Sequence, residues 1–200
     1  MRRGFALLRP PGHHSRPQTP MGFCLFNNIG VAAASLLQEF PTTRLAIVDF
    51  DLHHGNGTQE SFLDNDQVLF LSSHRLPFYP GTGRMDEHGV GLGKGLTVNF
   101  PLPKAYADPV LVSIYGRFAL PIIEAFRPDM ILVSAGYDGH EGDPMQGLKL
   151  TTGFYGALTE ALIAVAEKVS DGKILFLLGR RVLTHPLVRK CACVPGPHSK

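Results

Sequence analysis

The residues best suited to chemistry in this sequence alternate with apolar ones at the end of an apolar run. Asp49, Asp51 and His53 occupy every second position there. In an extended backbone alternate side chains share one face, so two carboxylates and an imidazole point the same way. Two acids in such a place are costly to bury unless a cation or hydrogen bonds compensate them. The spacing therefore favours a metal site over a charged loop in water, with Asp143 as the candidate third ligand for zinc or ferrous iron.

A histidine pair, His13 and His14, follows two prolines and a glycine. A lone histidine is more often structural, but two in tandem together with a metal cluster favour acid–base chemistry. Imidazole titrates near neutrality, so one ring can take a proton from metal-bound water and one can return it to a leaving amine. Asp49 and Asn56 are the candidates to orient the two rings.

The other histidines and the cysteines have a plainer interpretation. We expect His54, which follows a ligand position, to be structural. His74, His88 and His140 are expected to be exposed polar residues of loops. The three cysteines form no disulfide framework, which suits a reducing compartment.

Length and composition indicate one domain. Two hundred residues, 44% of them hydrophobic, suffice for one buried core. The apolar run at residues 5–8 is too short for a secretory signal, and no stretch approaches the roughly 20 apolar residues that cross a bilayer, so we expect neither secretion nor a membrane span. Five of the 19 basic residues and no acidic ones lie in 180–200. The rest of the chain is mildly acidic, which gives direct nucleic-acid binding no support.

Short apolar runs alternate with amphipathic segments along the chain. The runs predict buried strands, and Ala, Leu, Ile and Val at three- and four-residue spacing predict helices. The expected strands are 5–8, 45–50, 68–71, 96–100, 130–133 and 174–178, and the expected helices are 28–40, 109–126 and 154–169. Such alternation is typical of a parallel α/β sheet. Residues 77–95, rich in glycine and turn residues, are interpreted as a long functional loop.

Several of the expected strands end in polar clusters. Residues 68–71 run into Ser72-Ser73-His74, and residues 130–133 lead to Asp138, His140, Glu141 and Asp143. In an open parallel sheet the carboxyl ends of the strands form the edge where ligands bind. We therefore expect these clusters to meet the aspartates and histidines described above at one site.

Five blocks stand in order along the chain. They are Arg9-Pro10-Pro11-Gly12-His13-His14, Gly22-Phe23-Cys24, the run from Asp49 to Thr58, Tyr79-Pro80-Gly81-Thr82-Gly83 and Gly142-Asp143-Pro144. Together they resemble the signature motifs of the zinc-dependent histone deacetylase and acetylpolyamine amidohydrolase family, and Asn56 resembles its class II members. The resemblance implies the family's three-layer arginase/deacetylase-like α/β fold, a parallel sheet with helices on both faces, here incomplete. It makes 1–178 a partial catalytic domain.

The resemblance also implies a role for each candidate residue. Asp51, His53 and Asp143 would ligate zinc, and His13 and His14 would be the general acid/base pair, oriented by Asp49 and Asn56. Phe23 and Tyr79 match aromatic walls of the tunnel that receives the acyl-lysine chain, and Leu150 falls near another tunnel position. The family's potassium-binding oxygens match Asp49, Asp51, His53 and Ser72, and Phe62 falls at a second potassium site.

The implied reaction is amide hydrolysis. Zinc would polarise an acetamide carbonyl and lower the pKa of the zinc-bound water, while the histidines transfer protons. The products would be acetate and a free amine. The substrate would be an acetylated lysine of a histone or another protein, or an acetylated polyamine. A nuclear or cytoplasmic location suits the family.

The chain departs from the family pattern at both ends. After residues 174–178 the family carries a Gly-Gly-Tyr motif whose tyrosine stabilises the oxyanion, whereas here Gly179-Arg180-Arg181 follows and no tyrosine occurs after Tyr155. Losing one such donor costs about a hundred- to a thousandfold in rate. We expect 179–200 to be a divergent, disordered basic tail, and an N-terminal part of the family domain to be missing.

Two alternatives stay open at this point. A catalytically inactive isoform that binds partners or acylated ligands without turnover would fit the missing tyrosine motif, and deacetylation that disappears on His14→Ala would reject it. An arginase-like metal hydrolase acting on another C–N bond would share the general fold, and a panel of amine substrates would separate it from a deacetylase.

Overall fold

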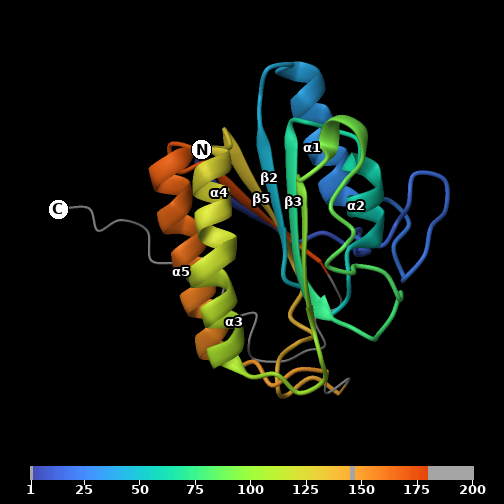
Figure 1. Ribbon diagram of the computed structural model, residues 1–200, viewed down its shortest axis with the longest axis vertical. Coiled ribbons are helices and arrows are strands. Elements are labelled where there is room, and N and C mark those ends of the chain that lie inside the picture. Colours follow the sequence, from blue (N-terminus) through green and yellow to red (C-terminus); the bar gives the residue numbers. More distant parts are fainter. Residues whose placement is uncertain (1, 145–146, 180–200) are drawn as a thin grey trace.

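A six-stranded parallel sheet forms the centre of the molecule (Figure 1). The computed structural model describes residues 2–144 and 147–179. The strand order is β1-β6-β5-β2-β3-β4, and every neighbouring pair is parallel. The strands are β1 Arg3–Ala6, β2 Leu45–Asp49, β3 Val68–Arg75, β4 Thr97–Leu102, β5 Met130–Ala135 and β6 Ile174–Leu178.

Helices cover both faces of this sheet, which confirms the expected three-layer α/β fold (Figure 1). One face carries α3 (Asp108–Ile114), the π turn η2 (Tyr115–Ala119), α4 (Leu120–Phe126) and α5 (Thr152–Val169). The other face carries α1 (Asn28–Glu39) and α2 (Asn56–Phe62), and a short 3-10 turn, η1 (Gly91–Gly93), interrupts the loop before β4.

The central strand β2 has no solvent-facing side. All five of its residues are buried, because β5 and β3 flank it and helices cover both faces. Ala46 and Val48 join the core cluster beneath α3, α4 and α5, whereas Leu45 and Ile47 join the cluster beneath α1. A strand buried on both faces is encoded by a continuous apolar run rather than by alternation. Asp49 is the first polar residue after that run.

The segment from α3 through η2 to α4 forms one continuous helix. Its buried side chains pack against the sheet and are Leu111, Tyr115, Ala119, Ile123 and Phe126. Among the described residues this helix is the one that is long and apolar enough to cross a membrane by length and composition, contrary to the expectation that no stretch approaches that length. Helices in the cores of soluble proteins meet the same criterion, and one side of this helix lies in the core.

The elements depart from the sequence-based expectation at two informative places. β3 continues to Arg75, so Ser72, Ser73 and His74 belong to a strand paired with β4 rather than to a loop. The helix α2 was not expected, since its sequence is short and polar, yet it begins at the candidate site residue Asn56. The predicted disordered tail, 179–200, lies outside the described part of the chain except for Gly179, which is buried and donates its backbone N–H to the carbonyl of Ala135 at 2.8 Å.

The 108–126 helix offers a matched test of its core face. Ile123 is fully buried, whereas Val112 is 54% exposed. Ile123→Ala should lower the free energy of unfolding by about 2–5 kcal/mol, because it removes buried methylenes and leaves a cavity. Val112→Ala should change it by less than about 0.5 kcal/mol. Chemical denaturation measures both, and equal small losses would contradict the assigned face.

Candidate active site

Three buried side chains converge at the carboxyl edge of the sheet. Asp51 and His53 follow β2, and Asp138 follows the neighbouring strand β5. Nδ1 of His53 lies 3.1 Å from Oδ1 of Asp51 and 2.9 Å from Oδ2 of Asp138. One potential ligand atom from each residue lies within 4.8 Å of the other two. One small cation can therefore contact all three residues.

Asp138 occupies the position in this cluster that was expected for Asp143. Asp138 comes shortly after the end of β5, is 4% exposed, and accepts a hydrogen bond from the backbone N–H of Leu52 at 2.9 Å. Asp143 lies further along in a turn, where its backbone N–H donates to the carbonyl of His140 at 2.9 Å. The structure thus corrects the third member of the cluster, because the residue nearer to the strand end reaches the sheet edge.

His13 is held between two buried carboxylates. Its Nδ1 donates to Oδ2 of Asp49 at 3.0 Å, and its Nε2 lies 3.8 Å from Oδ2 of Asp51. Burial disfavours a charge on the ring, but Asp51 and Asp49 outweigh burial and raise the pKa of His13 to about 9. Nε2 of His13 and Oδ2 of Asp51 are both buried and lack a hydrogen-bond partner among the described residues. Two such atoms side by side indicate a site for a further group, such as a cation.

The pKa values of the two buried acids, Asp49 and Asp51, shift in opposite directions. Burial raises the pKa of Asp49 above its ordinary value, although His13 opposes the shift. Burial also acts against ionisation of Asp51, but the charge on His13 and the hydrogen bonds from His53 lower the pKa of Asp51 below its ordinary value. Asp51 is therefore ionised at neutral pH, which is the state that a metal ligand requires.

His14 packs against His13 with ring centroids 4.0 Å apart. Its Nδ1 donates to Oδ1 of Asn56 at 2.9 Å, and Nδ2 of Asn56 lies 3.4 Å from the sulfur of Met21. The ring of Tyr79 meets His14 edge-on, with centroids 5.1 Å apart. The structure thus pairs His13 and His14 with the two partners expected for them.

Two glycines make room for the buried carboxylates. A Cβ atom on Gly136 would overlap Oδ2 of Asp51, and a Cβ atom on Gly55 would overlap Oδ2 of Asp49. A side chain at either position would push a carboxylate out of place. The backbone therefore approaches both acids as closely as sterics allow.

Comparison with known proteins shows the family to which the chain belongs. Residues 1–179 match a family described as histone deacetylase domain. The chain belongs to the histone deacetylase family. Histone deacetylase 10, chloroplastic, from Oryza sativa subsp. japonica is 46% identical over 175 residues, which are 88% of this chain and 40% of the rice protein. A protein named "Probable deacetylase" from Archaeoglobus fulgidus is 43% identical over 174 residues, which are 87% of this chain and 48% of that protein.

A solved structure agrees with this chain in fold. The crystal structure of the HDA15 HD domain superposes with a TM-score of 0.79 and 40% sequence identity, covering 90% of this chain and 51% of that one. The chain thus spans about half the length, or less, of the deacetylase-family proteins that it matches.

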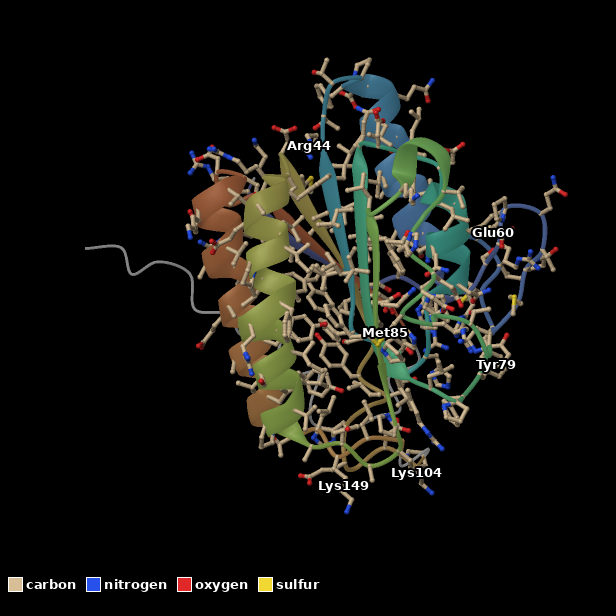
Figure 2. The ribbon with its side chains drawn as sticks, in the orientation of Figure 1. Arg44, Glu60, Tyr79, Met85, Lys104 and Lys149 are labelled. Carbon is tan, nitrogen blue, oxygen red and sulfur yellow. The ribbon has the colours of Figure 1, made fainter. Side chains whose placement is uncertain are left out.

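The tunnel residues implied by family resemblance separate into two groups. Tyr79 is 44% exposed on the loop after β3 and lies at the surface of the molecule (Figure 2). Phe23 is 81% exposed and follows Gly22, which packs against His14. Leu150, in contrast, is 1% exposed and belongs to the core cluster beneath α5, so the structure places it in the core and not on an exposed wall.

One aromatic neighbour of the cluster was missed by the sequence analysis. Phe78 stacks on His53 with ring centroids 4.9 Å apart, and the guanidinium of Arg75 lies 4.0 Å above the same Phe78 ring. Phe78 directly precedes the tunnel candidate Tyr79, so its place in the motif was a signal that could have found it.

The residues implied for potassium stay a prediction. They are Asp49, Asp51, His53, Ser72 and Phe62. Oγ of Ser72 lies 2.9 Å from Nδ1 of His74 in a hydrogen bond, and Phe62 is buried in the core cluster beneath α1.

A second histidine pair, His54 and His74, is buried next to the cluster, with ring centroids 4.6 Å apart. Burial lowers the pKa of His54 to about 3 and that of His74 to about 4, so both rings are neutral. The expectation that His74 and His140 are exposed is wrong, since both are buried, and β3 carries His74 into the sheet. His88 is exposed, as expected.

The neutral His74 makes the stability of the protein depend on pH. Its pKa is about 4 in the fold against an ordinary 6.5, so unfolding below pH 6.5 takes up a proton. The free energy of unfolding should therefore fall by up to about 3 kcal/mol on account of His74 as the pH drops from above 6.5 to below 4. Chemical denaturation across this pH range measures the effect.

The matched variants are His74→Asn and His88→Asn. His74→Asn should take up about one proton fewer on unfolding within that range, whereas His88→Asn should behave as the unaltered protein. An unaltered pH dependence in His74→Asn would contradict the neutral assignment.

Proposed function

We propose that this chain is the metal-binding and proton-transferring part of a zinc-dependent amidohydrolase that releases acetate from acetyl-lysine or a related acylated amine. The observation that carries the proposal is the buried cluster of Asp51, His53 and Asp138 next to the His13 and His14 pair. Membership of the histone deacetylase family supports a hydrolase.

The cluster suits zinc in its donor atoms and its charge. Two carboxylates and one imidazole, with a further coordination position open, are typical of catalytic zinc, and ferrous iron accepts the same donors. The unpartnered Oδ2 of Asp51 is a buried acceptor that a cation would satisfy. Bound zinc supplies a Lewis acid for the substrate carbonyl and activates a water as the nucleophile.

The histidine pair divides the remaining chemistry. Asp49 accepts the Nδ1 proton of His13, which leaves Nε2 of His13 directed toward Oδ2 of Asp51 and the proposed cation site. Asn56 accepts the Nδ1 proton of His14 without adding a charge. Nε2 of His14 is therefore the atom that takes a proton from the attacking water and returns it to the leaving amine.

The Gly-Gly-Tyr motif that follows the last strand in the family is replaced here, which bears on the turnover rate. No tyrosine follows Tyr155 in the sequence, so no tyrosine is assigned to stabilise the oxyanion. Since one preorganised oxyanion donor contributes about a hundred- to a thousandfold in rate, we propose turnover slower by that factor than in a relative that carries the tyrosine.

The substrate and the compartment belong to the proposal as well. Relatives named histone deacetylases support an acetylated histone lysine, and another acetylated protein or an acetylated polyamine offers the same acetamide. A nuclear or cytoplasmic location is proposed from the resemblance, and the word chloroplastic in the names of the rice and Arabidopsis thaliana relatives adds a plastid to the compartments to test.

Zinc content distinguishes the two candidate third ligands. Asp138→Ala should abolish zinc binding, because it removes a ligand, whereas Asp143→Ala should retain the zinc of the unaltered protein. Elemental analysis of the purified, folded variants measures the ratio of zinc to protein. Zinc lost from Asp143→Ala and kept in Asp138→Ala would overturn the assignment of Asp138.

Acetate release tests the role of His14. His14→Ala should lower the turnover of an acetyl-lysine peptide by about a hundred- to ten-thousandfold, because it removes the group that moves protons, while zinc content stays the same. Ser61→Ala, an exposed position on helix α2, serves as the matched control and should retain turnover. Equal turnover in His14→Ala and the unaltered protein would refute the proposed mechanism.

A further inference from the structure

The carboxylate of Glu87 closes the turn that follows Tyr79. Both of its oxygens lie 3.0 Å from the backbone N–H of Gly83, and Oε1 also accepts from the backbone N–H of Arg84 at 3.0 Å. A fourth hydrogen bond comes from Nε2 of Gln59, on helix α2, at 2.7 Å from Oε2. Glu87 therefore joins the loop to a helix whose first residue, Asn56, belongs to the active site.

This contact determines the orientation of the Gln59 amide and, through it, the protonation of a buried ring. A carboxylate accepts but does not donate, so the Gln59 atom that faces Glu87 must be the amide nitrogen. The Oε1 atom of Gln59 then accepts from Nε2 of His54 at 2.9 Å and from Nδ2 of Asn99 at 2.8 Å. His54 thus carries its proton on Nε2, and its Nδ1 accepts the hydroxyl proton of Thr82 at 2.7 Å.

The loop backbone lies directly against the buried histidine pair. The carbonyl of Gly83 accepts a hydrogen bond from Nε2 of His74 at 2.9 Å. Gly83 has a φ of +88°, and a Cβ atom at this position would overlap both His54 and His74. Any other residue at position 83 would therefore strain the backbone and push the loop away from the two rings.

The same loop carries the aromatic residues that contact the site. Phe78 stacks on His53, and Tyr79 meets His14 and His53 with centroid separations of 5.1 Å and 6.2 Å. The hydrogen bonds at Thr82 and Gly83 lie only a few residues beyond Tyr79. The chain of contacts from Glu87 through Gln59 and His54 therefore fixes the end of the loop that presents the aromatic wall.

We propose that Glu87 is a positioning residue, which holds the Tyr79 loop against the active site by setting the Gln59 amide and the Nε2–H form of His54. The inference rests on the proposed function where it concerns substrate, since Tyr79 is there a wall of the acyl-lysine path. Glu87 itself contacts neither the metal cluster nor the acid–base pair through any hydrogen bond described above.

The test is Glu87→Gln in the full chain. The new amide has one acceptor oxygen in place of two, so either the backbone N–H groups of the loop or the Gln59 amide nitrogen loses its acceptor, and the link between loop and helix breaks. With an acetyl-lysine peptide, KM should rise about tenfold while kcat stays within about twofold, because the wall is displaced and the proton-transferring groups are not. Amide hydrogen exchange of residues 78–87 should accelerate, and the ring-nitrogen resonances of His54 in 15N-histidine protein should leave the Nε2–H pattern.

Two further variants separate positioning from general damage. Asp86→Asn makes the same change of charge one residue away. The Asp86 side chain is exposed, and its ion pair among those described is with Arg84. This variant should match the unaltered protein in KM, in amide hydrogen exchange and in the His54 signals. The double variant Gln59→Glu with Glu87→Gln exchanges the two groups. The residue 87 oxygen still accepts from Gly83 and Arg84, its nitrogen donates to the residue 59 carboxylate, and that carboxylate accepts from His54 and Asn99. It should restore KM, exchange and the His54 signals.

The outcomes are distinguishable from those of the proposed function. Unchanged exchange and unchanged His54 signals in Glu87→Gln, or a folded double variant that restores neither, would overturn the positioning role. If no variant turns over any acetylated substrate, the proposed function fails, but exchange and the His54 signals still decide whether Glu87 positions the loop.

Discussion

Two fully buried carboxylates at the end of the central strand impose the strongest constraint on this molecule. Asp49 and Asp51 are 0% exposed, and an uncompensated buried charge costs several kcal/mol. The chain compensates them locally: the backbone N–H of Asp51 donates to Asp49 at 3.1 Å, and that of His53 donates to Asp51 at 2.9 Å. His13 then lies between both acids. One acceptor, Oδ2 of Asp51, is left over, and it lies where the cation is proposed.

The parallel sheet brings the remaining partners of these acids into reach. Asp49 pairs in register with Ser72 on β3 and with Ser134 on β5, although the three residues are far apart in sequence. Asp138 therefore arrives beside Asp51 because β5 is the neighbour of β2, and α2 brings Asn56 beside His14. Burial by helices on both faces keeps water away and makes each of these hydrogen bonds matter.

Much of the fold could be predicted from local pattern, because strands buried on both faces are continuous apolar runs and core helices repeat at helical spacing. The pairing of His13 with Asp49 and of His14 with Asn56 could also be predicted through the family motifs. Which of two acids close together in the sequence joins the cluster could not be predicted. Asp138 and Asp143 follow the same strand, and only the path of the backbone after β5 decides which carboxylate turns inward.

Burial of polar residues was equally hidden from the sequence. His74 looks like a loop residue by type, yet strand pairing with β4 and the close approach of Gly83 enclose it. Family resemblance puts Leu150 near a tunnel position, whereas the structure buries this apolar side chain in the core. The helix α2 escaped notice because polar residues encode it and its stability comes from packing rather than from propensity.

The π turn in the 108–126 helix keeps one stripe of side chains on the sheet along the whole length of that helix. In a regular α-helix, side chains four residues apart drift around the axis by about 40° at each step. The wider turn at Tyr115–Ala119 takes up this drift, so that Leu111 before it and Ile123 after it both enter the core, and the Tyr115 hydroxyl reaches Oγ of Ser73 at 2.9 Å. The turn thus holds one residue more than a regular α-helical turn, and deleting one of its residues would let the helix become regular while Leu111 and Ile123 keep their places on the sheet. Deleting a residue from the regular helix α4 would instead rotate everything beyond it by about 100°.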